Sequence, residues 1–286
     1  MAEGGAAPPA AAMRGKGVSS VIVIVVAVIT FLAGLGVGSV FLGARAPPAK
    51  TILVVAVQVP FPPFADFNKT SGEFEGFEMD IVKLIAAELN LTPVYRQFSN
   101  FPALLAETGT GGVDMASASI TITAARNATM DFSDTYYIAD QGVLVQSSST
   151  LVCPSNDCTN SPQTLKDSII GVQQGTTSFI WVNSTVKPLM SDPANQIKVF
   201  AQVPEVLTAL RQGVVDVVIM DLPVVTAYAN APSSGLKVVG KILTNELYGF
   251  AVANNDPQGL VPVINAVLSR IRASGDYDDL ITKWFA

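Results

Sequence analysis

The feature that most constrains this fold is an alternation of apolar strands and amphipathic helices that occurs twice along the chain. In the first half, the run TILVVAVQ at 51–58 is rich in β-branched residues, which is typical of a buried strand. The segment GFEMDIVKLIAAELN at 76–90 places its apolar residues on one face of a helix. A strand at 92–98, a short helix at 101–107 and a strand at 113–117 follow. This order predicts an α/β unit with a largely parallel sheet.

The same order recurs after a change in composition near residue 143, where a stretch rich in Ser, Thr, Cys and Pro follows at 147–163. The second half predicts strands at 169–172, 196–200 and 214–220, and helices at 178–186 and 204–212. We therefore expect two α/β lobes, with a ligand in the cleft outside the carboxyl ends of their strands.

Two extended segments, at 142–146 and 248–253, separate the halves and are predicted to form a hinge. The chain then ends with predicted helices at 257–274 and 277–285. The predicted division gives 51–142 and 248–286 to lobe 1, and 143–247 to lobe 2.

An uncharged apolar run, VSSVIVIVVAVITFLAGLGVGSVFL, begins at Val18. As a helix it is roughly 37 Å long, which exceeds a hydrocarbon core of about 30 Å. It is longer than the apolar core of a cleaved signal peptide, so we expect a transmembrane anchor at 18–43, although the residues that follow leave cleavage open. The Ala-, Gly- and Pro-rich residues 1–17 are expected to be disordered, and 44–50 to form a linker.

The composition excludes several classes of function. The net charge of −6 and the lack of basic clusters argue against a nucleic-acid partner. The chain contains no histidine, which removes the commonest metal ligand and the commonest general base. We therefore expect no metal, no cofactor and no catalytic residue.

Cys153 and Cys158 are the only cysteines of the chain. The residues between them, Pro-Ser-Asn-Asp, favour a turn, and so the pair is expected to form a disulfide in an oxidising compartment. A metal site is the alternative at this point, but it lacks further thiols or imidazoles to complete it.

Longer motifs resemble a known family. In chain order they are VPFPPF, GFEMDIVKLIAAELN, SITITAAR, MDFSDTYYIADQGVLV, GVQQGTTS, AQVPEVLTALRQGVVDVVIMD and DYDDLITKWF. Their order and spacing over 51–286 resemble the extracellular solute-binding proteins of family 3, the polar amino-acid binding components of ABC importers. The resemblance implies a two-lobed type II periplasmic-binding-protein fold with a monomeric soluble part that faces outside. Such a protein closes on an amino acid and docks on an ABC transporter permease.

Two charged residues fit the recognition of a zwitterion. Arg126 is isolated in a stretch rich in Thr, Ser and Ala, and a guanidinium suits bidentate binding of a carboxylate. From chemistry alone, a salt bridge with Asp131 or Asp134 fits equally well. Asp221 ends the apolar strand VDVVIMD, where its charge needs a cation such as a ligand ammonium, or it caps the helix that follows. The resemblance assigns Arg126 to the ligand carboxylate and Asp221 to its ammonium.

The resemblance also implies neutral contacts to the ligand. Ala118 offers its backbone carbonyl, Ser119 its backbone amide and Thr121 its hydroxyl, although the latter two also suit ordinary turns. Phe61 and Phe101 match positions where aromatic rings pack on the ligand's carbon chain, although either ring also suits the core.

A turn formed by Gly175, Thr176 and Thr177 follows a predicted strand and opens a predicted helix. Helix N-termini favour anions, so its amides would point at the ligand carboxylate from lobe 2. The alternative is a plain connection between the strand and the helix.

Gln58 departs from the family pattern, because many members carry an acidic residue there that serves a basic ligand side chain. Gln58 is neutral and offers both a donor and an acceptor. This disfavours lysine, arginine and ornithine and favours a neutral polar ligand such as glutamine, unless Glu73, Glu75 or Asp140 enters the pocket.

Two other functions compete with binding for import. An enzyme of the cyclohexadienyl-dehydratase type on the same fold would need an acid or base in the cleft. Glu205 and Glu246 are its candidates in the second half, and both are expected at the surface. An anchored amino-acid sensor would need a partner protein, because only residues 1–17 precede the predicted span.

Overall fold

The computed structural model describes residues 50–286. Among these residues no helix is both long enough and apolar enough to cross a bilayer. The disordered segment predicted at 1–17, the anchor predicted at 18–43 and all of the predicted linker except Lys50 lie outside the described residues.

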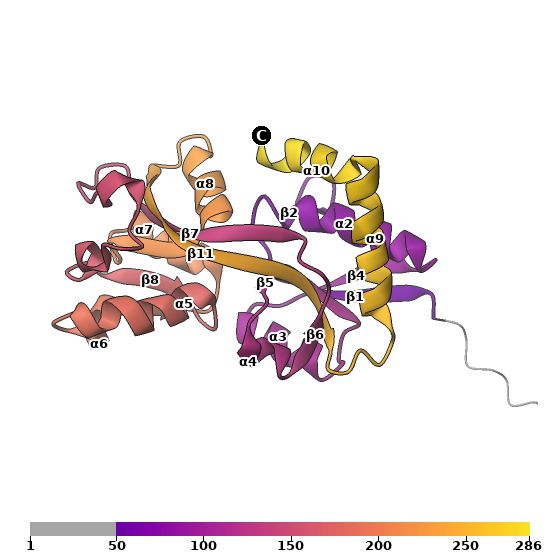
Figure 1. The fold of residues 1–286 in the computed structure, drawn as a ribbon. Helices are drawn as coiled ribbons and strands as arrows, with labels where there is room; N and C mark the ends of the chain where they lie inside the picture. The colour runs from indigo at the N-terminus through magenta and orange to yellow at the C-terminus, as the bar shows by residue number, and fades with distance from the viewer. Residues whose placement is uncertain (1–49) are drawn as a thin grey trace, which may run out of the picture. The chain divides into compact units, whose positions relative to one another are not determined.

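Lobe 1 is built on a parallel sheet in which β1 (Ile52–Val57) lies between β4 (Thr92–Gln97) and β5 (Met115–Thr121). The helices on either side of it are α2 (Phe77–Glu88), α3 (Phe101–Gly109), α9 (Leu260–Ser274) and α10 (Asp276–Phe285) (Figure 1). The smaller elements are α4 (Ala124–Asn127), β6 (Met130–Phe132) and a hairpin of β2 (Asp66–Asn68) with β3 (Glu73–Glu75). The C-terminal helices α9 and α10 return to contact α2, so both ends of the described chain belong to this lobe.

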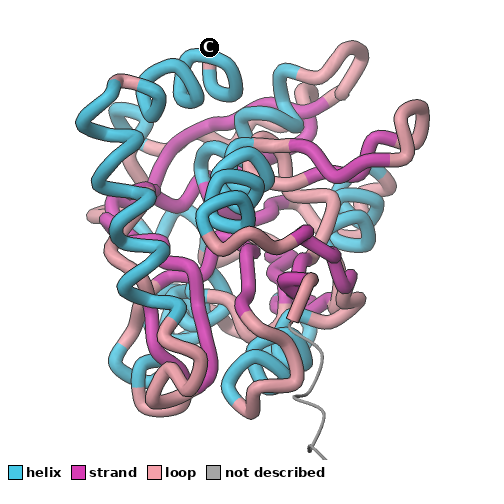
Figure 2. Tube along the Cα trace, turned by 90° about the vertical axis from the view of Figure 1, so that its right-hand side faces the viewer, coloured by secondary structure: helices cyan, strands magenta, loops and turns pink. Residues whose placement is uncertain are grey.

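Lobe 2 repeats the pattern with β8 (Ile170–Gln173) between β9 (Ile197–Phe200) and β10 (Val217–Asp221), all parallel. Its α-helices are α5 (Thr177–Trp181), α6 (Pro193–Gln196), α7 (Val203–Arg211) and α8 (Leu222–Asn230). The 3₁₀ turns are η1 (Pro154–Asn156), η2 (Pro162–Leu165) and η4 (Lys187–Leu189), and η3 (Val182–Val186) is a π-helical turn. Figure 2, in which lobe 1 faces the viewer, shows helices on both sides of the strands of lobe 1.

Two long antiparallel strands, β7 (Tyr137–Gln146) and β11 (Leu236–Ala253), run side by side between the lobes (Figure 1). They link the strands into the order β4-β1-β5-β11-β7-β10-β8-β9, with β6 paired to β11. The lobe boundaries predicted at 142/143 and 247/248 fall inside these two strands. The connection between the lobes is therefore a pair of continuous strands.

The structure also contains elements that the sequence did not predict. The strand β11 begins at Leu236, well before the segment predicted at 248–253. Its first two thirds, LKVVGKILTNEL, mix Lys, Thr, Asn and Glu with apolar residues and have no long apolar run. Pairing with β7 stabilises it as a strand. The helix predicted at 178–186 is α5 followed by η3.

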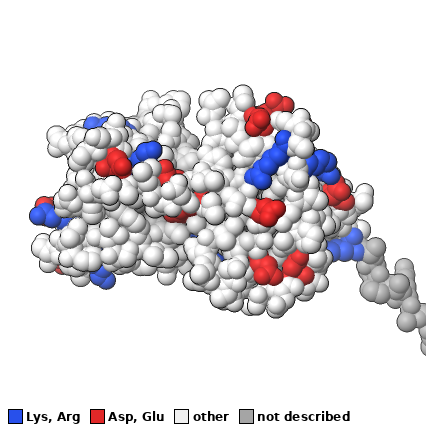
Figure 3. Space-filling model, in the orientation of Figure 1, with Lys and Arg blue, Asp and Glu red and all other residues white. Residues whose placement is uncertain are grey.

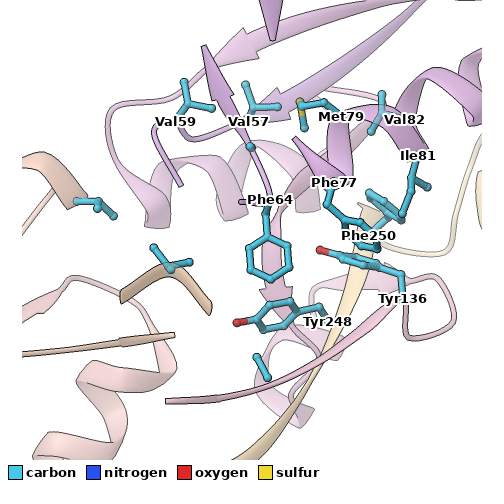
Figure 4. Close-up of a cluster of buried hydrophobic side chains, with 14 of the residues drawn as sticks. Val57, Val59, Phe64, Phe77, Met79, Ile81, Val82, Tyr136, Tyr248 and Phe250 are labelled. Carbon is cyan, nitrogen blue, oxygen red and sulfur yellow. The ribbon is translucent and has the colours of Figure 1, made fainter. Parts of the chain in front are cut away.

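An aromatic cluster at the centre of lobe 1 holds the loop that follows β1 (Figure 4). Phe64 is fully buried and makes edge-to-face contacts with Phe77, Tyr248 and Phe285 at centroid distances of 6.4, 5.6 and 5.2 Å. Edge-to-face packing of this kind stabilises aromatic pairs beyond their buried area. The contact with Phe285 fixes the C-terminal helix, and Phe64 fixes the loop that carries Phe61.

The predicted disulfide between Cys153 and Cys158 is confirmed. Both residues are fully buried and belong to the apolar core of lobe 2. A side chain at Gly240 would collide with Cys153, so the bridged loop packs directly on β11.

Candidate functional site

A cavity between the lobes gathers the residues that the sequence singled out. Every residue predicted to contact the ligand, except Gly175, lines it. Gln173, Ser178, Ile219 and Met220 also line it, and the sequence did not single them out. The cavity lies where β1, β5, β8 and β10 end, as expected for a ligand site in an α/β protein.

Arg126 projects from α4, whose first turn is capped by the Thr123 side chain. Its guanidinium donates to the Thr121 carbonyl at 2.8 Å and, across the cleft, to the Gly175 carbonyl at 3.1 Å. It also lies 5.3 Å from the ring centre of Phe101. Burial lowers the pKa of Arg126, and the negative charges of Glu246 and Asp221 oppose this. Within 50–286 no carboxylate lies within salt-bridge distance of Arg126, so the pairings with Asp131 or Asp134 do not form.

Asp221 ends β10 at the base of the cavity and is 9% exposed. It occupies the N-cap position of α8, but its side chain makes no capping hydrogen bond. Its Oδ1 instead accepts from Gln141 Nε2 at 2.6 Å. Burial, followed by the charge of Glu246, raises the pKa of Asp221 to about 7. The cavity thus holds a basic group and an acidic group on opposite lobes.

The turn before α5 supplies backbone groups and no free hydroxyl hydrogen. Thr176 is the N-cap of α5, and its hydroxyl accepts from Phe179 N and donates to the Gln173 carbonyl. The Thr177 hydroxyl donates to Glu246 at 2.7 Å. Gly175 has a φ of +76°, and a Cβ there would lie 2.8 Å from Pro102 Cγ of lobe 1. A glycine is therefore needed where the lobes meet.

Glu78 is a buried carboxylate beside the cavity that the sequence did not reveal. It accepts from Ser117 Oγ, Ser119 N, Ser119 Oγ and Tyr136 OH at 2.8, 2.9, 2.5 and 2.7 Å. Burial raises its pKa, and the hydrogen bonds from Ser119, Tyr136 and Ser117 oppose the shift. Ser119 has a φ of +48°, a conformation that Glu78 stabilises through its amide and hydroxyl. The Ser119 amide is therefore engaged within lobe 1.

Gln58 and Gln173 meet across the cleft. Gln173 Nε2 lies 3.1 Å from the Ala201 carbonyl, which can only accept, and 2.8 Å from Gln58 Oε1. This fixes the orientation of both amides, because a donor on Gln173 requires an acceptor on Gln58. Gln58 Nε2 is then a buried donor with no partner among residues 50–286.

The structure corrects the placement of Glu246, which was expected at the surface. Glu246 is only 6% exposed, and its carboxylate accepts from Thr121 Oγ1, Gln141 Nε2 and Thr177 Oγ1 at 2.6, 2.7 and 2.7 Å. Glu246 lies in an irregular part of β11, so the alternation of apolar and polar residues does not predict its burial. Glu205 is exposed, as expected, and accepts from the amides of Ala201 and Gln202, which immediately precede α7. Glu73, Glu75 and Asp140 do not line the cavity.

Comparison with known proteins identifies the family of this chain. The chain belongs to the bacterial extracellular solute-binding proteins of family 3, whose model matches residues 53–286. The resemblance seen in the sequence is therefore confirmed.

Individual relatives cover most of the chain. A probable histidine-binding protein of Neisseria gonorrhoeae is 32% identical over 251 residues, which cover 85% of this chain and 87% of the relative. The glutamine-binding protein of an ABC transporter from Bacillus subtilis is 30% identical over 219 residues, which cover 76% of this chain and 75% of the relative. An ancestral arginine-binding protein bound to arginine superposes with a TM-score of 0.72 at 31% identity, over 83% of this chain and 99% of its own. The superposition confirms the two-lobed type II fold, and all three are binding proteins.

Proposed function

We propose that this protein binds one amino acid between its lobes, outside the cytoplasm, and delivers it to an ABC-type importer. Family membership and the names of the relatives support this class of function. The observation that carries the proposal is that Arg126 of lobe 1 and Asp221 of lobe 2 line the same cavity. A zwitterion that contacts both residues bridges the lobes and favours their closure.

The backbone of the ligand is recognised by opposite charges. Arg126 binds the α-carboxylate, together with the amides of the 175–177 turn. Thr121 also lines the cavity, but its hydroxyl donates to Glu246. Asp221 binds the α-ammonium with the Ala118 carbonyl, and Phe61 and Phe101 pack against the ligand's carbon chain. All of these residues except Gly175 line the cavity, which supports a common role.

The ligand side chain is neutral, polar and glutamine-like. The relatives bear the names of three different amino acids, so the choice rests on this chain's own residues. Gln58 Nε2 is a buried donor without a partner, and a buried donor left unpaired costs about 1–3 kcal/mol. A side-chain carbonyl would accept from it, whereas lysine and arginine side chains offer donors alone.

Titration calorimetry of the purified full-length protein against glutamine, histidine, arginine, lysine and glutamate tests this proposal. We expect glutamine to bind tightest, and Gln58→Asp to lose affinity for glutamine and gain affinity for arginine, since a carboxylate replaces the unpaired donor. Thr208→Val is a suitable control because its hydroxyl bonds to its own helix in lobe 2. Tightest binding of arginine by the parent protein would reject the glutamine assignment. Absence of binding to any amino acid would reject the function.

The location and the partners of the protein follow from the same proposal. Residues 18–43 anchor the chain in the cell membrane, the lobes face outside as a monomer, and a permease receives the ligand. Retention of the protein in the membrane pellet after alkaline carbonate extraction tests the anchor. Release into the supernatant would show that the segment is cleaved or does not span.

A further inference from the structure

We propose that Glu246 is a positioning residue that holds the two lobes in the closed arrangement without touching the ligand. This inference rests on the proposed function only in that closure traps an amino acid. Glu246 is not among the described residues that line the cavity. Its role must therefore act through the residues that it contacts.

The contacts of Glu246 come from both lobes. Its Oε2 accepts from Thr121 Oγ1, at the end of β5 in lobe 1, and from Thr177 Oγ1, at the start of α5 in lobe 2. These two distances are 2.6 and 2.7 Å. Because one oxygen serves a hydroxyl of each lobe, a separation of β5 from α5 by more than about 1 Å breaks one of the bonds. We call Glu246, Thr121 and Thr177 the clasp.

The second carboxylate oxygen ties the clasp to the hinge. Glu246 Oε1 accepts from Gln141 Nε2 at 2.7 Å, and the same nitrogen donates to Asp221 at 2.6 Å. Gln141 Oε1 accepts from Ser178 of α5 at 2.7 Å. Every oxygen of the buried carboxylate is thus satisfied in the closed arrangement, which offsets the cost of removing its charge from water.

A bulge in the hinge strand points Glu246 inward. The pairing of β11 with β7 runs from Ile242 opposite Gln141 to Glu246 opposite Ala139, so β11 carries extra residues between them. Asn245 in this bulge has a φ of +48°. Asp140 accepts from the amides of Thr244 and Asn245 at 3.1 and 3.2 Å and stabilises the bulge. Bulges commonly redirect a side chain in this way.

Pulsed electron paramagnetic resonance measures closure directly, as the distance between two spin labels on opposite lobes. Thr110→Cys at the C-cap of α3 and Ile180→Cys on α5 place labels on opposite lobes, in the groove that both residues line. Both native cysteines are in the disulfide and do not take label. The distance is recorded in the full-length protein without ligand and with saturating amino acid.

Three variants and one control are compared in this background. Glu246→Gln removes the charge, Glu246→Asp keeps the charge but withdraws it by one methylene, and Thr177→Val removes the hydroxyl from lobe 2. We expect all three to lower the closed-to-open ratio about tenfold, which corresponds to about 1.4 kcal/mol. Glu205→Gln should match the parent, since Glu205 contacts its own lobe.

Identical distance distributions for the parent and the three variants, with and without ligand, would overturn the clasp. A distance distribution of Glu246→Asp equal to that of the parent would also overturn the clasp, because a negative charge without the bridging geometry would then be enough to hold the lobes closed. If no amino acid binds the parent but the three variants open the lobes, the clasp stands and the proposed function fails. If amino acids bind the parent and its variants alike and the distances do not change, the function stands and the clasp fails.

Discussion

Replacement of Gly175 by alanine is predicted to weaken ligand binding by obstructing closure. An added Cβ would lie 2.8 Å from Pro102 Cγ and 3.3 Å from Pro102 Cδ. Carbon atoms in contact prefer a separation of about 3.5–4.0 Å, so the lobes must part by about 0.7 Å at this point. The proline ring is rigid and sits in the first turn of α3, and it cannot move aside without moving that helix.

The separation has a calculable consequence for Arg126. Its Nη2 lies 3.1 Å from the Gly175 carbonyl, and an additional 0.7 Å takes this pair to about 3.8 Å, beyond hydrogen-bond reach. Loss of a hydrogen bond to a charged group costs about 1.5–3 kcal/mol. The dissociation constant should therefore rise at least about tenfold.

Backbone strain is separated from closure by a matched control. Gly175 and Gly235 have φ values of +76° and +66°, but a Cβ at Gly235 meets nothing within 4 Å. Both alanine variants should lose about 1 kcal/mol of unfolding free energy from the left-handed backbone, and only Gly175→Ala should lose affinity. Calorimetric titration gives the affinity, and thermal denaturation without ligand gives the stability. Binding by Gly175→Ala with the affinity of the parent would refute the reasoning.

Two further predictions concern the charged residues of the cavity. Arg126→Ala should weaken amino-acid binding about 100-fold in calorimetry, because the ligand carboxylate loses a charged donor. The control Arg96→Ala, which breaks an exposed ion pair with Glu107, should bind like the parent. Equal affinities of the two variants would remove Arg126 from the site. The pKa of Asp221 is raised from 3.8 to about 7, so the folded protein holds an extra proton between these pH values. Its free energy of unfolding without ligand should therefore fall as the pH rises from about 4 to 7. Ligand affinity should instead rise over about pH 6 to 8, because the Asp221 carboxylate ionises there. Denaturation and calorimetric titration at a series of pH values measure the two trends. Asp221→Asn should abolish the pH dependence of stability, and an unchanged pH dependence in that variant would assign it to another group.

Charged side chains of both signs occur on the surface of the described residues. Basic and acidic side chains are interspersed on the face drawn in Figure 3, and the basic ones do not gather into a single patch there.

Local patterns in the sequence were sufficient for most of the fold. The apolar face of α2 and the strand at β1 were predicted to within two residues, because periodicity reports directly which side chains face a core. The disulfide followed from the short spacing and turn residues between its cysteines. The motifs that carry the family resemblance identified Arg126 and Asp221, and the fold places both in the same cavity.

The tertiary structure alone decided the roles of Glu246, Glu78 and Gln173. Glu246 lies in the polar stretch TNE of β11, and a bulge held by Asp140 turns it inward, which no local period encodes. Glu78 lies in the first turn of an amphipathic helix, like many exposed acidic residues. Its hydroxyl partners are two serines of β5, 39 and 41 positions further along the chain, and Tyr136. The orientation of Gln58 depends on Gln173, which is 115 positions away.

These contacts share one physical reason. A carboxylate or an amide is buried only where donors and acceptors from distant segments meet, and the sequence states which groups exist but not which of them meet. The sequence by itself therefore determined two α/β lobes, their hinge segments and the charged pair that suits a zwitterion. Only the tertiary structure decided how that pair is positioned, which buried amide donor is left without a partner and which carboxylate contacts both lobes.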